Sequence, residues 1–137
     1  MDLHINWLAV ALATLSTMVV GTVWYLPKVF GNRWQALTGV DPNKPKSRVA
    51  AYGGSFVASA ITAIVLAGAT YVASAHFGTP FLGAALLTAV SLWAGFTATR
   101  ILVHELFESR PISIWLITAA YELVTVLVMA VIIGLLN

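Results

Sequence analysis

Four long apolar runs constrain the fold of this chain more than any other feature. They cover residues 5–25, 49–75, 81–106 and 111–136. At about 1.5 Å per helical residue, each run is long enough to cross a hydrocarbon core about 30 Å thick. In lipid, a helix satisfies the polar backbone groups of such a run within the segment itself. The sequence therefore predicts an all-α membrane protein: a single domain, residues 1–137, forming an antiparallel bundle of four transmembrane helices.

The composition excludes several other classes of protein. Charged residues make up 9% of the chain, whereas soluble domains carry roughly 25%. Cysteine is absent, which rules out disulfide frameworks, thiolate metal sites and cysteine nucleophiles. A formal net charge of +2 is small. We therefore expect the lipid bilayer, and no nucleic acid, as the surroundings of this protein.

The connection between the first two runs, residues 26–48, is long, basic and interrupted by proline and glycine. Within it, Phe30, Trp34 and Leu37 fall at helical spacing. This pattern suits a short helix in the headgroup region, and an irregular loop anchored by Trp34 fits it equally well. The other two connections are tight hairpins, and Pro111 suits the first turn of the fourth helix.

The distribution of lysine and arginine predicts an orientation. Cytoplasmic loops of membrane proteins carry an excess of these residues. Six of the seven lie in or beside the first and third connections, at Lys28, Arg33, Lys44, Lys46, Arg48 and Arg110. We therefore expect these two connections in the cytoplasm and both termini outside.

Small residues recur every four positions in the second run. Such a stripe lets helix backbones approach closely, which is how apolar helices associate in lipid. We expect it to pack against another helix, either of the same chain or of a neighbouring one. The stripe consists of Ala51, Ser55, Ser59, Ala63 and Ala67.

Ionisable residues inside the last two runs form the candidate site. They are expensive in lipid and should face protein or water. In a regular helix, Thr97, Arg100 and His104 share one face with Trp93 and Glu108. The fourth run offers Thr118, Tyr121 and Glu122. Arg100 and Glu122 lie at similar depth on antiparallel helices, and the sequence predicts an intramembrane ion pair between them. Alternatively, Arg100 reaches the headgroups and Glu122 stays neutral beside Thr97, Thr118 or Tyr121.

Little in the sequence indicates reaction chemistry. A lone histidine near a membrane boundary, such as His104, is more typical of an interfacial residue than of a metal or haem ligand, and no second ligand is evident. The chain contains no Ser/His/Asp set, phosphate-binding glycine motif or carboxylate cluster. We expect no enzyme, no cofactor and no metal site.

Two stretches resemble a bacterial membrane family known as domain of unknown function 1761. The first contains Asn6-Trp7-Leu8-Ala9, Gly21, Trp24-Tyr25, Pro27, Phe30-Gly31 and Trp34; the second contains Gly95-Phe96, Leu106-Phe107-Glu108, Arg110-Pro111, Ala119-Ala120-Tyr121 and Leu123. The resemblance implies a four-span protein of the bacterial cytoplasmic membrane, without an established activity. Members tend to carry histidine at the position of Glu122 and an uncharged residue at that of Arg100, and this chain departs from both.

Two functions are compatible with these features. The first is a bundle that acts by association, as a homo-oligomer or as an accessory subunit of a larger membrane complex. The second is a small proton-coupled transporter or exporter that uses Glu122. The two differ in whether Glu122 takes up and releases protons.

Overall fold

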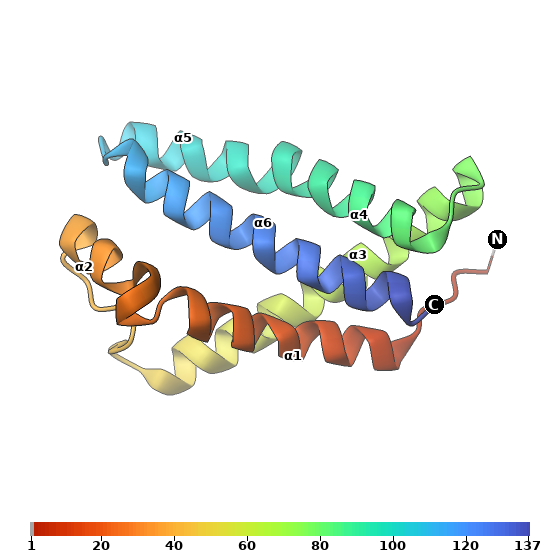
Figure 1. Ribbon diagram of the computed structural model, residues 1–137, viewed down its shortest axis with the longest axis horizontal. Coiled ribbons are helices and arrows are strands. Elements are labelled where there is room, and N and C mark those ends of the chain that lie inside the picture. The colour runs from red at the N-terminus through yellow and green to blue at the C-terminus, as the bar shows by residue number, and fades with distance from the viewer. Residues whose placement is uncertain (1) are drawn as a thin grey trace.

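The computed structural model describes residues 2–137, in which the chain forms helices and no strands (Figure 1). Four helical stretches are long and apolar enough to cross a membrane, which confirms the predicted all-α, four-span architecture. Their bounds lie within two residues of the four apolar runs. In three places the helix widens into a short π-helical segment, labelled η. The spans are α1 (Trp7–Trp24), η2 with α3 (Val49–Gly53, Gly54–Phe77), α4 with η3 and α5 (Phe81–Leu92, Trp93–Ala98, Thr99–Phe107), and α6 (Ile112–Leu135).

Local chemistry fixes where the helices begin and end. The Asn6 side-chain oxygen accepts hydrogen bonds from the backbone N–H groups of Leu8 and Ala9, at 3.1 and 3.2 Å, and so caps α1. The α3 helix stops at Gly78, whose φ of 62° suits glycine. Pro80 and Pro111 directly precede α4 and α6, where the missing proline N–H has no helical partner to lose.

The first connection contains a short helix, which was one of the two alternatives that the sequence left open. It consists of η1 (Pro27–Gly31) and α2 (Asn32–Thr38). Phe30 stacks on Trp24 with ring centroids 4.4 Å apart, and Trp34 meets Tyr25 edge-on at 5.6 Å. At Gly31 the chain folds back so tightly that a Cβ atom would collide with the Tyr25 carbonyl oxygen. This turn therefore requires glycine and holds the short helix against the end of α1.

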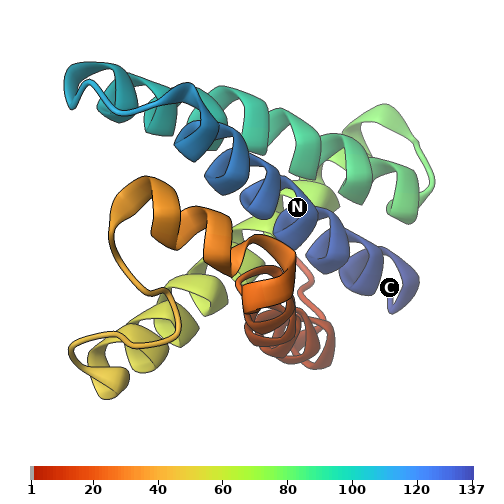
Figure 2. The same ribbon diagram turned by 60° about the vertical axis from the view of Figure 1, so that its left-hand side comes forward.

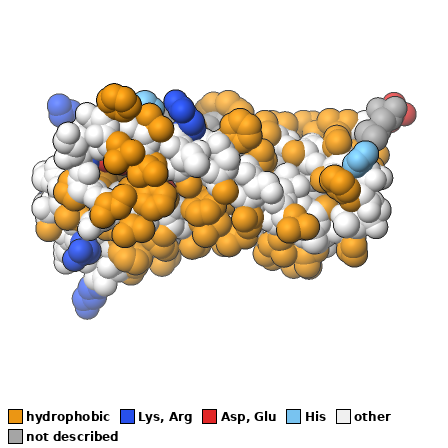
Figure 3. Space-filling model, turned by 90° about the horizontal axis from the view of Figure 1, so that it is seen from above, with side chains coloured by type: hydrophobic (Ala, Val, Ile, Leu, Met, Phe, Trp, Pro, Cys, Tyr) orange, Lys and Arg blue, Asp and Glu red, His pale blue; other side chains and the backbone are white. Residues whose placement is uncertain are grey.

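The four spans form a closed ring, in which α1 and α4 each contact both α3 and α6. Figures 1 and 2 show the two chain ends at one end of the bundle and the first and third connections at the other. We call these the terminal end and the basic end. Lys and Arg side chains gather in the half toward the basic end, and hydrophobic side chains are spread along the whole length of the face in Figure 3.

The core lies in the half of the bundle nearer the terminal end and consists mainly of alanine. Across residues 2–137, ten of the sixteen buried hydrophobic residues are alanines. The largest fully buried side chains in this half include Leu66, Met129 and Ile133. At Gly134 a Cβ atom would lie only 2.8 Å from the Leu82 Cα, so α4 and α6 approach each other almost backbone to backbone. Small residues thus give this half its tight packing.

The half nearer the basic end is more open. Residues 52–58, which cover the end of η2 and the start of α3, are all exposed. In both views, the beginning of the second span diverges from α5 (Figures 1 and 2). The space between them is partly occupied by α1, α2 and α6. Polar and aromatic side chains are concentrated in this open half.

Candidate functional site

The π-helical segment η3 changes which face of the third span points inward. Seven and eleven residues after the buried Ala89, a regular helix returns to the same face at Phe96 and Arg100. In the structure, Phe96 is 74% exposed and Arg100 is also exposed, whereas Ala98 and Glu105 are buried. Each extra residue in a helix turns all later residues by about 100°. The widened turn at Trp93–Ala98 therefore brings a different set of side chains inside.

The predicted ion pair between Arg100 and Glu122 is wrong. Within residues 2–137, the ion pairs between side chains involve Arg110, and none joins Arg100 to Glu122. The prediction rested on the similar depth of the two residues on antiparallel helices, and depth does not fix the direction around the helix axis in which Arg100 points. Arg100 and His104 lie on the exposed face, while Glu122 is half-buried on α6.

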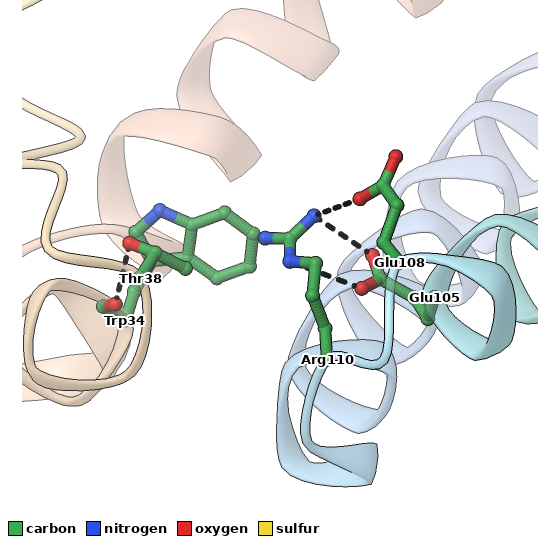
Figure 4. A network of polar contacts seen from close by, with 5 residues as sticks. All are labelled: Trp34, Thr38, Glu105, Glu108 and Arg110. Atoms are coloured by element: carbon green, nitrogen blue, oxygen red, sulfur yellow. Dashed lines mark hydrogen bonds and ion pairs between the residues drawn. The ribbon is translucent and has the colours of Figure 1, made fainter.

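A buried carboxylate that the sequence did not single out lies one residue from His104. Glu105 is 6% exposed, and its Oε2 lies 3.2 Å from the Arg110 Nε. The Arg110 guanidinium also donates to Glu105 Oε1 at 3.3 Å and to Glu108 Oε2 at 3.4 Å (Figure 4). The Trp34 indole lies on the side of this guanidinium away from the two carboxylates (Figure 4). Arg110 thus links the end of α5 to the start of α6 beside the first connection.

Two tryptophans tie the third span to the fourth. The Trp93 Nε1 donates to the Ala119 carbonyl oxygen, and the Trp115 Nε1 donates to the Ala98 carbonyl oxygen, each at 2.8 Å. Both bonds involve η3, one through its first residue and the other through its last. Because the bonds run in opposite directions, they fix η3 against α6. Periodicity cannot reveal such contacts, because the acceptors are backbone carbonyls.

Tyr121 lies at the junction of α6 with α1. Its ring meets Tyr25 edge-on with centroids 5.3 Å apart, and its hydroxyl would lie 3.1 Å from a Cβ at Gly21. The Trp24 ring is also near, at 6.2 Å. Thr118 has a buried hydroxyl oxygen one turn earlier on α6. Of the predicted polar residues, Tyr121 therefore joins an aromatic cluster with α1, while Arg100 and His104 lie outside it.

A groove of ≈ 330 Å³ opens beside this cluster, between α1, the start of the second span, the first connection and α6. Its lining combines polar and apolar side chains. The Asn43 Nδ2 donates to the Tyr25 carbonyl oxygen at 2.9 Å and so holds the first connection over the end of α1. The polar side chains lining the groove are Thr17, Thr22, Tyr25, Asn43, Tyr52, Ser55 and Tyr121.

The small-residue stripe of the second span has two parts: one packs against helices of the same chain, and the other lines the groove. Ala63 and Ala67 are buried in the core, and the Thr17 hydroxyl of α1 donates to the Ser59 hydroxyl at 2.9 Å. Ala51 and Ser55 line the groove instead. The helix facing the packed part of the stripe thus belongs to the same chain.

Thr97 lies in a separate groove of ≈ 390 Å³ between α3 and the third span, which Trp93 and Phe96 also line. It is therefore not a neighbour of Tyr121 in the first groove. Around His104, as elsewhere within residues 2–137, no three histidine, aspartate or glutamate side chains come close enough to hold a metal ion.

Comparison with known families adds the identification. A family model described as "Protein of unknown function (DUF1761)" matches residues 8–134, nearly the whole bundle. The chain belongs to the DUF1761 family. The match confirms the family suggested by the two motif stretches. No curated protein and no solved structure matches the chain. In this DUF1761 protein, the stretch from Leu106 to Pro111 forms the turn in which Arg110 binds Glu105 and Glu108.

Proposed function

We propose that this protein acts by association within a bacterial cytoplasmic membrane, as a homo-oligomer or as an accessory subunit of a larger complex, without reaction chemistry of its own. In this proposal the basic end faces the cytoplasm and both termini lie outside. The main support is an exposed row of small residues on α3. Gly54, Ala58 and Thr62 follow one another at four-residue spacing, and all three are exposed.

This row is distinct from the stripe used inside the chain. It is offset by one residue, about 100° around the helix, from the line of Ser55, Ser59 and Ala63. A Cβ atom at Gly54 would meet nothing within 4 Å. In lipid, exposed small residues at this spacing allow another helix to approach closely, and van der Waals packing then favours association.

The neighbouring groove suits the same partner. Ile61, Thr62 and Val65 of α3 form one wall, while Trp93 and Phe96 of the third span form the other. A helix lying against Gly54 and Ala58 would continue into this mainly apolar groove. It would cover Phe96, one of the most exposed aromatic side chains in the spans.

Replacing Gly54 with leucine tests the proposal. Gly95 provides a matched control, because it also lies in a membrane span and has nothing within 4 Å of its Cβ position. We expect Gly54→Leu to reduce association measured by energy transfer between labelled copies in liposomes, while thermal stability in dilute detergent is kept. Gly95→Leu should change neither. Equal association of the wild type and Gly54→Leu would reject this interface.

Proton-coupled transport is the second candidate, and the position of Glu122 supports it. This carboxyl group is half-buried within a span and has no ion pair among residues 2–137. A structural carboxylate inside a membrane is normally paired, whereas a coupling carboxylate must be free to bind and release a proton. The aromatic cluster of Tyr25 and Tyr121 lies nearby, on the side of the polar groove.

Titration of Glu122 decides between the candidates. Infrared difference spectra of the protein in nanodiscs, compared with those of Glu122→Gln, isolate its carboxyl band. Coupling requires a change of protonation between about pH 5 and pH 9, the range in which a carrier loads and releases protons. A band that stays constant across this range would remove the transport proposal and leave the association proposal untouched.

A further inference from the structure

We propose that the groove between α1, the start of the second span and the first connection binds the headgroup of an anionic phospholipid from the leaflet at the basic end. The groove lies in the basic-end half of the spans, where we expect the headgroups of that leaflet to come within its reach. Its mouth reaches the surface of the bundle, because Tyr52 and Ser55 are both exposed. Lipid binding here is independent of self-association, which uses the neighbouring face of α3.

The lining of the groove suits a phosphodiester. Tyr25, Tyr52 and Tyr121 together with Ser55 supply hydroxyl groups, and a phosphate oxygen accepts hydrogen bonds from such donors. No carboxylate lines the groove. Its volume, ≈ 330 Å³, lies within the range of small-molecule sites. The lining of the groove thus offers hydrogen-bond donors and no carboxylate.

The charges beside the groove favour an anion. Lys44 lies between two groove-lining residues, Asn43 and Pro45, and Lys46 follows. Residues 41–48 contain Lys44, Lys46 and Arg48 against the single Asp41, a net charge of +2. The three cations are exposed. Basic residues directly beside a membrane span attract anionic lipids at short range.

A lipid suits this site better than a soluble phosphate compound. The groove also contains Met18, Pro42, Pro45 and Ala51, so part of its lining is apolar. It adjoins the outer surface of α1, where Val19 and Val23 are 64% and 52% exposed. A phospholipid can place its phosphate among the hydroxyls while its acyl chains lie along the apolar surface. A soluble phosphate compound would leave that surface unused.

The test is a lipid titration of the detergent-purified protein, followed by its thermal unfolding midpoint. We expect short-chain phosphatidylglycerol to raise the midpoint more than phosphatidylcholine of the same chain length. The double variant Lys44→Gln/Lys46→Gln should bind phosphatidylglycerol about thirtyfold more weakly, because each lysine near an anionic lipid contributes about a factor of five. The matched control, Lys28→Gln/Arg33→Gln, removes two cations outside the groove and should change affinity less than about twofold.

Two further measurements are needed. One distinguishes a lipid from free phosphate as the ligand, and the other tests whether the ligand binds in the groove. Inorganic phosphate at the same concentration should not compete, and Ser55→Leu should weaken phosphatidylglycerol binding by filling the mouth. Equal effects of both lipids, equal losses in the two double variants, or full competition by inorganic phosphate would each overturn the proposal. Because the lysine variants change only exposed side chains, they remain informative if Ser55→Leu disturbs folding.

Discussion

Arg110 holds two carboxylates of unequal exposure, and this inequality determines what each contributes. The Glu105 side chain is 8% exposed and that of Glu108 is 57% exposed. A carboxylate in water loses little when its partner is removed. A buried one loses both its partner and its hydration. The pair with Glu105 should therefore control the stability of the turn, whose Ser109 adopts a φ of 54°.

A double-mutant cycle on this pair should show strong coupling. Arg110→Met leaves Glu105 buried and unpaired, and we expect a loss of about 3 kcal/mol in the free energy of unfolding. Glu105→Met should lose less, because Arg110 is 34% exposed and keeps Glu108. The double variant should be more stable than Arg110→Met alone. The measurement is reversible unfolding in mixed micelles.

Glu108→Gln is the control for this cycle, with an expected change below about 1 kcal/mol because the group is exposed. Additive losses for Arg110→Met and Glu105→Met would show that the two side chains do not interact.

No pattern in the sequence indicated this pair, because Glu105 and Arg110 are five positions apart and only the turn between their helices brings them together.

At the scale of the helical elements, hydropathy predicted the four membrane spans. It did not predict which face of α5 points into the bundle. The lengths of the four apolar runs were enough to predict four spans, because a bilayer imposes a minimum length on every crossing helix. The short helix of the first connection was also indicated by the spacing of Phe30, Trp34 and Leu37. The face of α5 could not be predicted, because a single wide turn between Trp93 and Ala98 leaves hydropathy almost unchanged.

The position of η3 also determines which parts of the candidate site were predictable. Tyr121 and Thr118 lie on α6, a helix without a π segment, and both are partly buried. Arg100 and His104 come after η3 in the chain and are exposed. The polar groove depends on the path of the first connection over α1, which no local pattern encodes.

Removing the extra residue should restore a regular third span and turn α5. Deleting Gly95 takes out a position with nothing within 4 Å of its Cβ. We expect α5 to rotate by about 100°, which breaks the bond from Trp115 to the Ala98 carbonyl and turns Glu105 away from Arg110. The expected loss is about 3 to 5 kcal/mol in the free energy of unfolding, mainly from the buried pair.

The control keeps the length of the span. Gly95→Ala adds a methyl group to open space and replaces a poor helix former with a good one, so it should be neutral or stabilising by up to about 1 kcal/mol. Both variants are measured by the same reversible unfolding. A deletion variant as stable as Gly95→Ala would show that η3 does not control the facing of α5.

At the scale of the whole molecule, the two ends of the bundle differ in charge and in packing. The terminal end contains the alanine-rich core, and the basic end contains the groove, the aromatic cluster and the Arg110 turn. The Asn6 Nδ2 donates to the Leu136 carbonyl oxygen at 2.8 Å, which joins the first and fourth spans at the terminal end. Whatever its orientation, the protein presents chemically different surfaces to the two leaflets.

Labelling of single cysteines should establish the orientation. The chain has no native cysteine, so each introduced thiol is the sole target. Gln35 and Asn137 are exposed and lie at opposite ends of the bundle. With the basic end in the cytoplasm, a membrane-impermeant maleimide added to intact cells should label Asn137→Cys and not Gln35→Cys. The reverse pattern would overturn the assignment, and both should react after the cells are opened.

The alanine-rich interior has a consequence for how this bundle tolerates change. Truncating side chains to alanine, the usual survey of a protein core, leaves positions such as Ala13, Ala63, Ala85 and Ala130 as they are. Their backbones are already close, and the damaging direction is therefore enlargement, because an added side chain must push two helices apart. A survey with leucine would map this interior, because an exchange that keeps hydrophobicity but increases volume is damaging here.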